Sequence, residues 1–140
     1  MILIDTNVIS ALMQREPEPA VVGWLDAQPA ESIWTTAITV FEVRFGLEIL
    51  ASGRRRRALE EAFTEVLRDD FEGRVLPFDE AAAEAAGRIA AERRRCGRAV
   101  EIRDVQIAGI AVARKAGIAT RNVRHFDGLG VNVIDPWSAG

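Results

Sequence analysis

Residues 1–13 read MILIDTNVISALM, and the architecture of the chain can be worked out from this pattern. The apolar run from Ile2 to Ile4 is typical of a short buried strand, and Asp5 ends it. The segment Asp5-Thr6-Asn7 supplies side chains that cap helices, and the apolar spacing from Val8 to Met13 favours a helix. The chain is therefore predicted to open with a strand, a turn and a helix, with Asp5 where the strand ends.

The rest of the chain repeats this alternation. Further strands are predicted at 32–35, 74–78, 118–120 and 131–134, and helices at 20–27, 37–50, 54–70, 79–96 and 102–116. Gly97 follows the helix 79–96 as a left-handed stop, Gly117 follows the helix 102–116, and Pro77 favours the end or edge of its strand. Helices 37–50 and 54–70 are expected to form a hairpin. Strands that alternate with helices predict a three-layer α/β/α fold with a central, mainly parallel five-stranded sheet.

Composition restricts the class of protein. The 140 residues fit one domain, 1–140, and 49% apolar with 28% charged residues is typical of soluble globular chains. The single cysteine, Cys96, excludes an internal disulfide and a four-ligand Cys/His zinc site, and favours a reducing cytoplasm. The apolar runs are too short for a signal peptide or a membrane span. The formal charge of −3 argues against nucleic-acid binding by overall charge, so any such contact must be local.

Asp5 is the first candidate functional residue. In an open parallel sheet, ligands bind beyond the carboxyl ends of the strands, which is where Asp5 is expected. The alternative is an N-cap, in which the carboxylate accepts a hydrogen bond from a free helix amide. For an aspartate considered alone the cap is the better interpretation. A functional role for Asp5 therefore depends on whether other carboxylates are expected near it.

Glu42 stands on an apolar face of the predicted helix 37–50. Its neighbours at helical spacing are Ile38, Phe45 and Ile49. A buried carboxylate needs an arginine, a proton or a metal ion to compensate its charge. The alternatives to a functional role are an ion pair with Arg44 or Arg103, or a place at the edge of the apolar face with access to solvent.

Asp104 repeats this pattern in the predicted helix 102–116, on a face with Ile107, Ala108 and Ala111. The alternative is that Asp104, in the first turn, only complements the helix dipole. Three acids brought together repel one another unless a divalent cation neutralises them. Oxygen ligands without a His or Cys pair select Mg²⁺ or Mn²⁺, and phosphodiester hydrolysis is the reaction such a site favours.

Four separated segments resemble the PIN-domain ribonucleases, and within them the VapC toxins of type II toxin–antitoxin pairs, with the FitB branch most similar. The segments are ILIDTNVIS at 2–10, VFEVRFG at 40–46, DVQIA at 104–108 and ATRNVRHF at 119–126. Their order and spacing agree with the family from residue 2 to about residue 136. The resemblance implies a Mg²⁺-dependent endoribonuclease that hydrolyses RNA phosphodiester bonds and is neutralised by an antitoxin.

Site residues follow from the same resemblance. It implies that Asp5, Glu42 and Asp104 are catalytic and ligate Mg²⁺ or Mn²⁺, and that Thr6 and Asn7 shape the turn around Asp5. Thr120 and Asn122 match a segment near the metal, where some PIN domains carry a fourth acid and this chain has an amide. Many relatives have Asp in place of His125, and Asp127 is a candidate substitute. Both one and two metal ions therefore stay as alternatives.

Three basic side chains accompany the late segment. His125 has a side-chain type suited to protonate the leaving oxygen, although a structural histidine hydrogen-bonded in the loop is the favoured interpretation. Arg121 and Arg124 are candidates to hold substrate phosphates, with ion pairs to Glu42 or Asp104 as the equal alternative.

Two arginine clusters lie outside the four segments. Residues 54–57 are all arginine, and Arg56 with Glu60 and Arg57 with Glu61 fit pairing on a solvated helix face. The cluster at 93–95 with Arg98 has fewer acids nearby, so a contact with phosphate is better supported there. Neither cluster contains aromatic residues for base stacking.

Nine apolar residues exceed what one face of each short helix needs to bury, and some of them are candidates for an interface with a partner. They are Val21, Val22, Trp24, Leu25, Leu47, Ile49, Leu50, Leu59 and Phe63. The resemblance implies a VapB- or FitA-type antitoxin that covers a groove there, a toxin homodimer and larger toxin–antitoxin assemblies. The equal alternative is that these residues complete the core. A catalytically weak PIN-fold module that binds RNA or antitoxin is the alternative function, because the fourth acid is missing.

Overall fold

Strand β1 (Ile2–Ile4) is the central strand of the sheet in the computed structural model, which describes residues 1–138. Beside it lie β2 (Ile33–Thr36) and β4 (Gly117–Ala119), and the edges are β3 (Val75–Leu76) and β5 (Val133–Ile134). The strand order is β3-β2-β1-β4-β5, and every pairing is parallel. The predicted fold class is confirmed, with a sheet that is wholly rather than mainly parallel.

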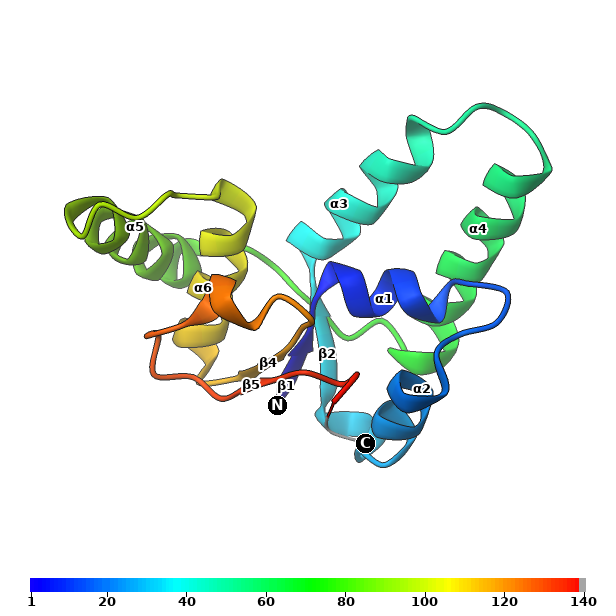
Figure 1. Cartoon of the computed structure of the whole chain (residues 1–140), viewed down its shortest axis with the longest axis horizontal. Coiled ribbons are helices and arrows are strands. Elements are labelled where there is room, and N and C mark those ends of the chain that lie inside the picture. Colours follow the sequence, from blue (N-terminus) through cyan, green and yellow to red (C-terminus); the bar gives the residue numbers. More distant parts are fainter. Residues whose placement is uncertain (139–140) are drawn as a thin grey trace.

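Helices cover both faces of this sheet (Figure 1). The α-helices within residues 1–138 are α1 (Thr6–Leu12), α2 (Pro19–Asp26), α3 (Ala37–Glu48), α4 (Arg54–Glu65), α5 (Glu80–Arg95) and α6 (Ile102–Arg114). The described residues also form three short helical turns. Two are 3-10 turns, η1 (Ala30–Ser32) and η3 (Val123–Phe126), and one is the π-helical turn η2 (Val66–Asp70). None of these helices is long and apolar enough to cross a membrane.

Alternate residues of β1 enter two separate cores. Ile4 packs in the core under α1, α2, α3 and α4, whereas Leu3 packs with residues of α5 and α6. Successive side chains of a strand point to opposite faces, so a buried strand must be apolar at every position. This is why three consecutive apolar residues, Ile2 to Ile4, start the central strand of the sheet.

The ends of two helices differ in an instructive way. Gly97 follows α5 with φ 71°, as predicted for a left-handed stop. After α6, however, the left-handed residue is Lys115 with φ 54°, and Gly117 is the first residue of β4. The predicted helix 102–116 is therefore two residues too long, because the chain must turn earlier to pair β4 with β1.

The helical hairpin is confirmed, with α3 and α4 side by side (Figure 1). Arg44 joins the two helices through Glu60 at 2.7 Å, and Arg56 through Glu48 at 2.6 Å. The predicted helix 54–70 is divided, since α4 ends at Glu65 and η2 continues it. Among the surplus apolar residues, those that pack in or against the core are Val21, Trp24, Leu25, Leu47, Leu50, Leu59 and Phe63, whereas Ile49 is exposed.

Candidate metal centre

Asp5 is buried at the carboxyl end of β1 and caps α1. Its Oδ1 accepts a hydrogen bond from the backbone N–H of Thr6 at 2.8 Å, which confirms the capping interpretation. Its Oδ2 accepts one from the hydroxyl of Thr120 at 2.8 Å and one from Nδ2 of Asn7 at 3.3 Å. The carboxylate is thus held in one orientation at the edge of the sheet where ligands bind in parallel α/β folds.

Thr120 fixes the neighbouring backbone as well. Its Oγ1 accepts hydrogen bonds from Nδ2 of Asn7 at 3.1 Å and from the backbone N–H of Asn122 at 3.0 Å. Oδ1 of Asn7 in turn accepts from the backbone N–H of Arg121 at 3.0 Å. The turn after β1 and the turn after β4 are therefore locked together, which is the shaping role that the resemblance implies for Asn7.

Glu42 reaches the same region from α3. Its Oε1 accepts a hydrogen bond from the hydroxyl of Thr6 at 2.8 Å, and its Oε2 lies 3.5 Å from Nη1 of Arg103. The ion pair with Arg103, one of the predicted alternatives, is present, whereas Arg44 pairs with Glu48 and Glu60 instead. The side chain of Glu42 remains 21% exposed, so one edge of this carboxylate is open.

The apolar face assigned to Glu42 is not the buried one. The buried residues of α3 are Thr39, Val43 and Leu47, whereas Phe45 and Ile49 are 45% and 72% exposed. The helical spacing identified an apolar stripe correctly but could not tell a core-facing stripe from one that faces outward. Arg103 covers part of it, since its guanidinium lies 5.9 Å from the ring centroids of Phe41 and Phe45.

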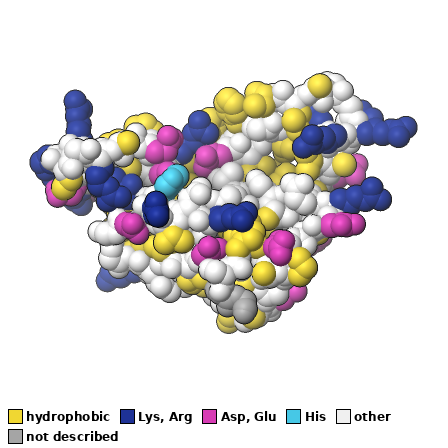
Figure 2. Space-filling view, in the orientation of Figure 1, with side chains coloured by type: hydrophobic (Ala, Val, Ile, Leu, Met, Phe, Trp, Pro, Cys, Tyr) yellow, Lys and Arg dark blue, Asp and Glu magenta, His cyan; other side chains and the backbone are white. Residues whose placement is uncertain are grey.

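Asp104 stands in the first turn of α6, and its predicted neighbours Ile107, Ala108 and Ala111 are buried. Its Oδ2 lies 2.7 Å from Nδ1 of His125. His125 is therefore a hydrogen-bonded histidine, as the favoured interpretation had it, but its partner is a candidate metal ligand rather than the loop. Figure 2 shows the single histidine of the chain beside acidic and basic side chains.

Burial destabilises the charged forms of all three acids, and repulsion from Asp5 adds to this effect at Glu42 and Asp104. Burial raises the pKa of Asp5, against the hydrogen bonds from Thr120 and Thr6. Burial also raises the pKa of Glu42, and the charges of Asp5 and Asp104 raise it further. The pKa of Asp104 is raised by burial, with His125 opposing the shift and Asp5 adding to it. Clustered carboxylates of this kind call for positive charge between them.

The donor set fits a hard divalent cation, because it offers only carboxylate, hydroxyl and amide oxygens. These donor atoms do not surround a ready-made coordination site. Within residues 1–138, no three His, Cys, Asp or Glu side chains are arranged as a ready metal cluster. Oδ2 of Asp104 and Oε2 of Glu42 face His125 and Arg103, so a metal ion would have to compete with these two side chains for the carboxylates.

The other predicted site residues lie around this group. Arg121 stacks on Trp137, with its guanidinium 4.7 Å from the ring centroid, and Arg124 is exposed. Neither forms an ion pair with Glu42 or Asp104 in the described part of the chain, so that alternative is wrong. Asp127 lines a pocket beside α5 that does not include any of the three acids in its lining.

Arg103 and Arg93 are the residues whose importance the sequence understated. Arg103 was considered only as a partner for Glu42, yet it also covers two exposed phenylalanines. Arg93 is only 8% exposed, which a row of consecutive arginines does not suggest. Helical spacing is the signal that could have found it, because Ala82, Ala85, Ala86 and Ile89 lie on the same side of α5.

The model of the PIN domain family matches residues 2–130. The chain is 42% identical over 139 residues to the plasmid stability protein StbB of Pseudomonas syringae pv. tomato, which covers 99% of this chain and 100% of that protein. It is 39% identical over 137 residues to the VapC ribonuclease Y4jK of Sinorhizobium fredii, with 98% of both chains covered. It is 36% identical over 137 residues to the toxin FitB of Neisseria gonorrhoeae, covering 98% and 99%.

Among solved structures, the crystal structure of FitAcB from Neisseria gonorrhoeae is similar, with a TM-score of 0.87 and 36% identity over 99% of both chains. The matched region includes β1, α3, α6 and β4, the elements that position the acids and Thr120. The chain belongs to the PIN-domain family. Within that family it is of the VapC and FitB type.

Proposed function

We propose that this protein is a Mg²⁺-dependent endoribonuclease that acts as the toxin of a VapBC-like toxin–antitoxin pair. The observation that carries the proposal is the group formed by Asp5, Glu42 and Asp104. They come from three different elements, burial raises the pKa of each, and the charge of Asp5 raises the pKa of Glu42 and of Asp104 further. The names of two relatives, VapC ribonuclease Y4jK and toxin FitB, support the activity and the biological role.

Asp5 and Asp104 would hold the cation most directly, with Glu42 as the third ligand and Mn²⁺ as the other candidate ion. When bound, the ion would stabilise negative charge on the phosphate and activate an attacking water. Thr6 and Thr120 keep Glu42 and Asp5 oriented through their hydroxyl groups. Arg121 and Arg124, free of ion pairs to these acids, are the side chains we assign to the substrate strand.

His125 is assigned a positioning role. Its Nδ1 is engaged by Asp104 at 2.7 Å, so this nitrogen is not available to the leaving oxygen in this arrangement. The ring instead keeps the Asp104 carboxylate aimed at the group of acids. Proton donation by His125 stays a prediction that no observation supports directly.

An antitoxin of the VapB or FitA type is the proposed partner, together with a toxin homodimer and larger assemblies, all in the cytoplasm. The exposed large apolar side chains beside the site are Phe41, Phe45, Ile49 and Ile102, and we call them the α3 patch. The rings of Phe41 and Phe45 pack edge to face, and exposed apolar side chains that gather on a surface mark interaction sites. The similarity to the FitAcB structure supports a protein partner on this chain.

The test is RNA cleavage by the purified chain with Mg²⁺ or Mn²⁺. Cleavage is expected to stop with EDTA and to fall at least about 100-fold in Asp104→Asn with the circular dichroism spectrum unchanged. Asp69→Asn is the matched control, because Asp69 is exposed and pairs only with Arg68. Cleavage by Asp104→Asn at the rate of the control would show that the site is misassigned.

A second candidate function is a PIN-fold module that binds RNA or antitoxin without turnover. Two observations favour it: the site is not a closed metal cluster in residues 1–138, and Asn122 stands where some relatives have a fourth acid. This module would bind RNA with the same affinity in EDTA and in Mg²⁺ and release no product. Cleavage by the unaltered protein rejects it.

A further inference from the structure

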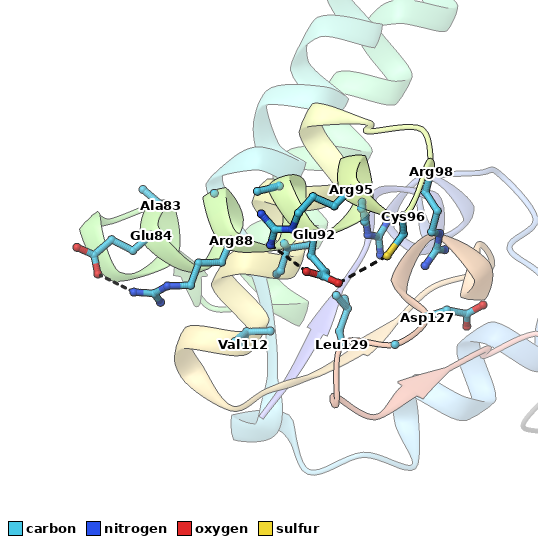
Figure 3. A pocket seen from close by; sticks show the side chains of 15 residues that line it. Ala83, Glu84, Arg88, Glu92, Arg95, Cys96, Arg98, Val112, Asp127 and Leu129 are labelled. Atoms are coloured by element: carbon cyan, nitrogen blue, oxygen red, sulfur yellow. Dashed lines mark hydrogen bonds and ion pairs between the residues drawn. The ribbon is translucent and has the colours of Figure 1, made fainter.

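A cavity lies beside α5, and neither Glu42 nor Asp5 lines it. It has a volume of about 870 Å³, within the range of about 300–1,000 Å³ that is common for ligand pockets. Residues of α5, Val112 of α6 and the segment 127–129 after η3 line it (Figure 3). We call it the α5 pocket. Its charged side chains are Glu84, Arg88, Glu92, Arg93, Arg95, Arg98 and Asp127.

Two of the four arginines in the α5 pocket are already neutralised. Arg88 lies 4.0 Å from Glu84, and Arg95 lies 2.9 Å from Glu92. Arg93 and Arg98 form no ion pair with any residue of 1–138. In Figure 3, Arg98 and Asp127 are at one end of the pocket and Arg88 and Glu84 at the other. At the end with Arg98, Asp127 is the acid, and it forms no ion pair with either arginine among residues 1–138.

Arg93 is the most unusual of these side chains. It is 8% exposed, and its buried Nη2 has no hydrogen-bond partner within the described residues. A buried polar group without a partner costs about 1–3 kcal/mol, and more when it is charged. A buried polar group without a partner needs a physical reason, and a bound anion would supply one because guanidinium groups match the geometry of phosphate oxygens.

The turn after α5 brings a second guanidinium to Arg93. The backbone N–H of Gly97 donates to the carbonyl of Arg94 at 3.0 Å, and that of Arg98 donates to the carbonyl of Arg93 at 2.8 Å. This pair of bonds is the Schellman motif, which requires the left-handed conformation seen at Gly97. Like charges are thereby placed together, and repulsion from Arg98 adds to burial in lowering the pKa of Arg93.

The charge of one proposed metal ligand also acts on an arginine of the α5 pocket. The charges of Asp104 and Asp127 act on Arg93 in the opposite direction to Arg98. Asp104 is itself a proposed metal ligand, and the turn η3 that carries His125 leads directly into the segment 127–129 of the pocket wall. An anion held by Arg93 and Arg98 would therefore lie within reach of the charge of Asp104.

We propose that Arg93 and Arg98 bind a phosphodiester group of the RNA strand, next to the phosphate that is cleaved. This inference rests on the proposed ribonuclease function and adds a second phosphate subsite to it. Planar guanidinium groups bind phosphate oxygens through two parallel hydrogen bonds, which would satisfy Nη2 of Arg93 and separate the two like charges. Free inorganic phosphate shares this chemistry, so the experiment must distinguish the two sources.

The experiment measures the affinity for a fluorescent single-stranded RNA in EDTA, where no cleavage occurs, at several salt concentrations. Arg98→Gln removes one exposed charge, and Arg93→Lys keeps the charge but removes the planar group. Arg94→Gln is the matched control, because Arg94 is exposed on α5 and does not line the pocket. Melting temperatures are compared first, so that only folded variants are used.

We expect Arg98→Gln to weaken RNA binding by about tenfold relative to Arg94→Gln. Its plot of log affinity against log salt should be less steep by about 0.7, the value for one contact to a single-strand phosphate. Arg93→Lys should weaken binding with the melting temperature unchanged. If both pocket variants bind RNA with the affinity and salt dependence of Arg94→Gln, the inference is wrong.

The other outcomes are equally decisive. Binding of inorganic phosphate that Arg98→Gln abolishes, with RNA affinity unaffected, would assign the pocket to a free anion and overturn the RNA assignment. If the unaltered protein cleaves RNA while the pocket variants match the control, only this inference fails. If Arg98→Gln weakens RNA binding but Asp104→Asn still cleaves, the subsite stands and the proposed catalytic site fails.

Discussion

At the scale of single residues, Asp104 is in a place that favours its protonated form. Burial and the charge of Asp5 raise its pKa, and His125 offsets this only in part. The folded state therefore binds a proton at this carboxyl more readily than the unfolded chain does. It follows that the ionised carboxyl lowers the free energy of unfolding above the raised pKa, and that this loss disappears as the pH falls through it.

This reasoning predicts that Asp104→Asn stabilises the metal-free protein. In EDTA near pH 7, the variant should have a higher free energy of unfolding than the parent, and the difference should shrink as the pH is lowered towards about 4. Urea unfolding followed by circular dichroism measures it. Added Mg²⁺ should stabilise the parent more than the variant. Asp69→Asn should give no gain at neutral pH, because Arg68 lowers the pKa of Asp69.

At the scale of elements, the contact between α5 and α6 depends on one glycine. A Cβ at Gly109 would lie 2.4 Å from the carbonyl oxygen of Ala82 and 2.7 Å from Cβ of Ala86. Such distances are well inside van der Waals contact, so the two helices approach as closely as backbone allows. The first turn of α6 carries Asp104, and the close approach therefore also helps to place the acid beside the sheet.

Gly109→Ala is expected to destabilise the protein by about 1–3 kcal/mol, because overpacking outweighs the better helix propensity of alanine. Chemical unfolding provides the measurement. The control is Gly46→Ala in α3, where a Cβ would meet no atom within 4 Å. That variant should be stabilised by about 0.5–1 kcal/mol. A stabilised Gly109→Ala would show that α5 and α6 can separate without loss.

At the scale of the whole molecule, most of the α3 patch belongs to α3 and its C-cap, one arm of the α3–α4 hairpin that projects from the molecule (Figure 1). Ile49 is the most exposed of its residues, and the edge-to-face pair Phe41–Phe45 has ring centroids 6.2 Å apart. A partner that covered this patch would also lie across the opening to Glu42. Inhibition by an antitoxin would then follow from simple obstruction.

Replacing Phe45 and Ile49 together by serine is predicted to weaken binding of the co-encoded antitoxin by at least about tenfold. RNA cleavage by the free variant should match that of the parent, because neither side chain contacts the three acids. Calorimetric titration and the cleavage assay measure the two effects. Unchanged antitoxin affinity would place the partner on another surface.

What the sequence determined by itself is the set of local properties. The apolar run Ile2–Ile4, the cap at Asp5 and the stop at Gly97 depend on neighbours within a few positions, so the α/β alternation and the three acids could be predicted. Predictions were wrong where contacts distant in the sequence decide the structure. The end of α6 is set at Lys115 by strand pairing, and the apolar stripe of α3 that carries Phe45 and Ile49 faces outward.

Only the tertiary structure decided which atoms meet. Thr120 donates to Asp5 across 115 residues, and Thr6 donates to Glu42 across 36. His125 rather than solvent faces Asp104, and the guanidinium of Arg93 is buried. The reason is that these contacts depend on how helices pack on the sheet, which is a property of the whole chain and not of any window along it.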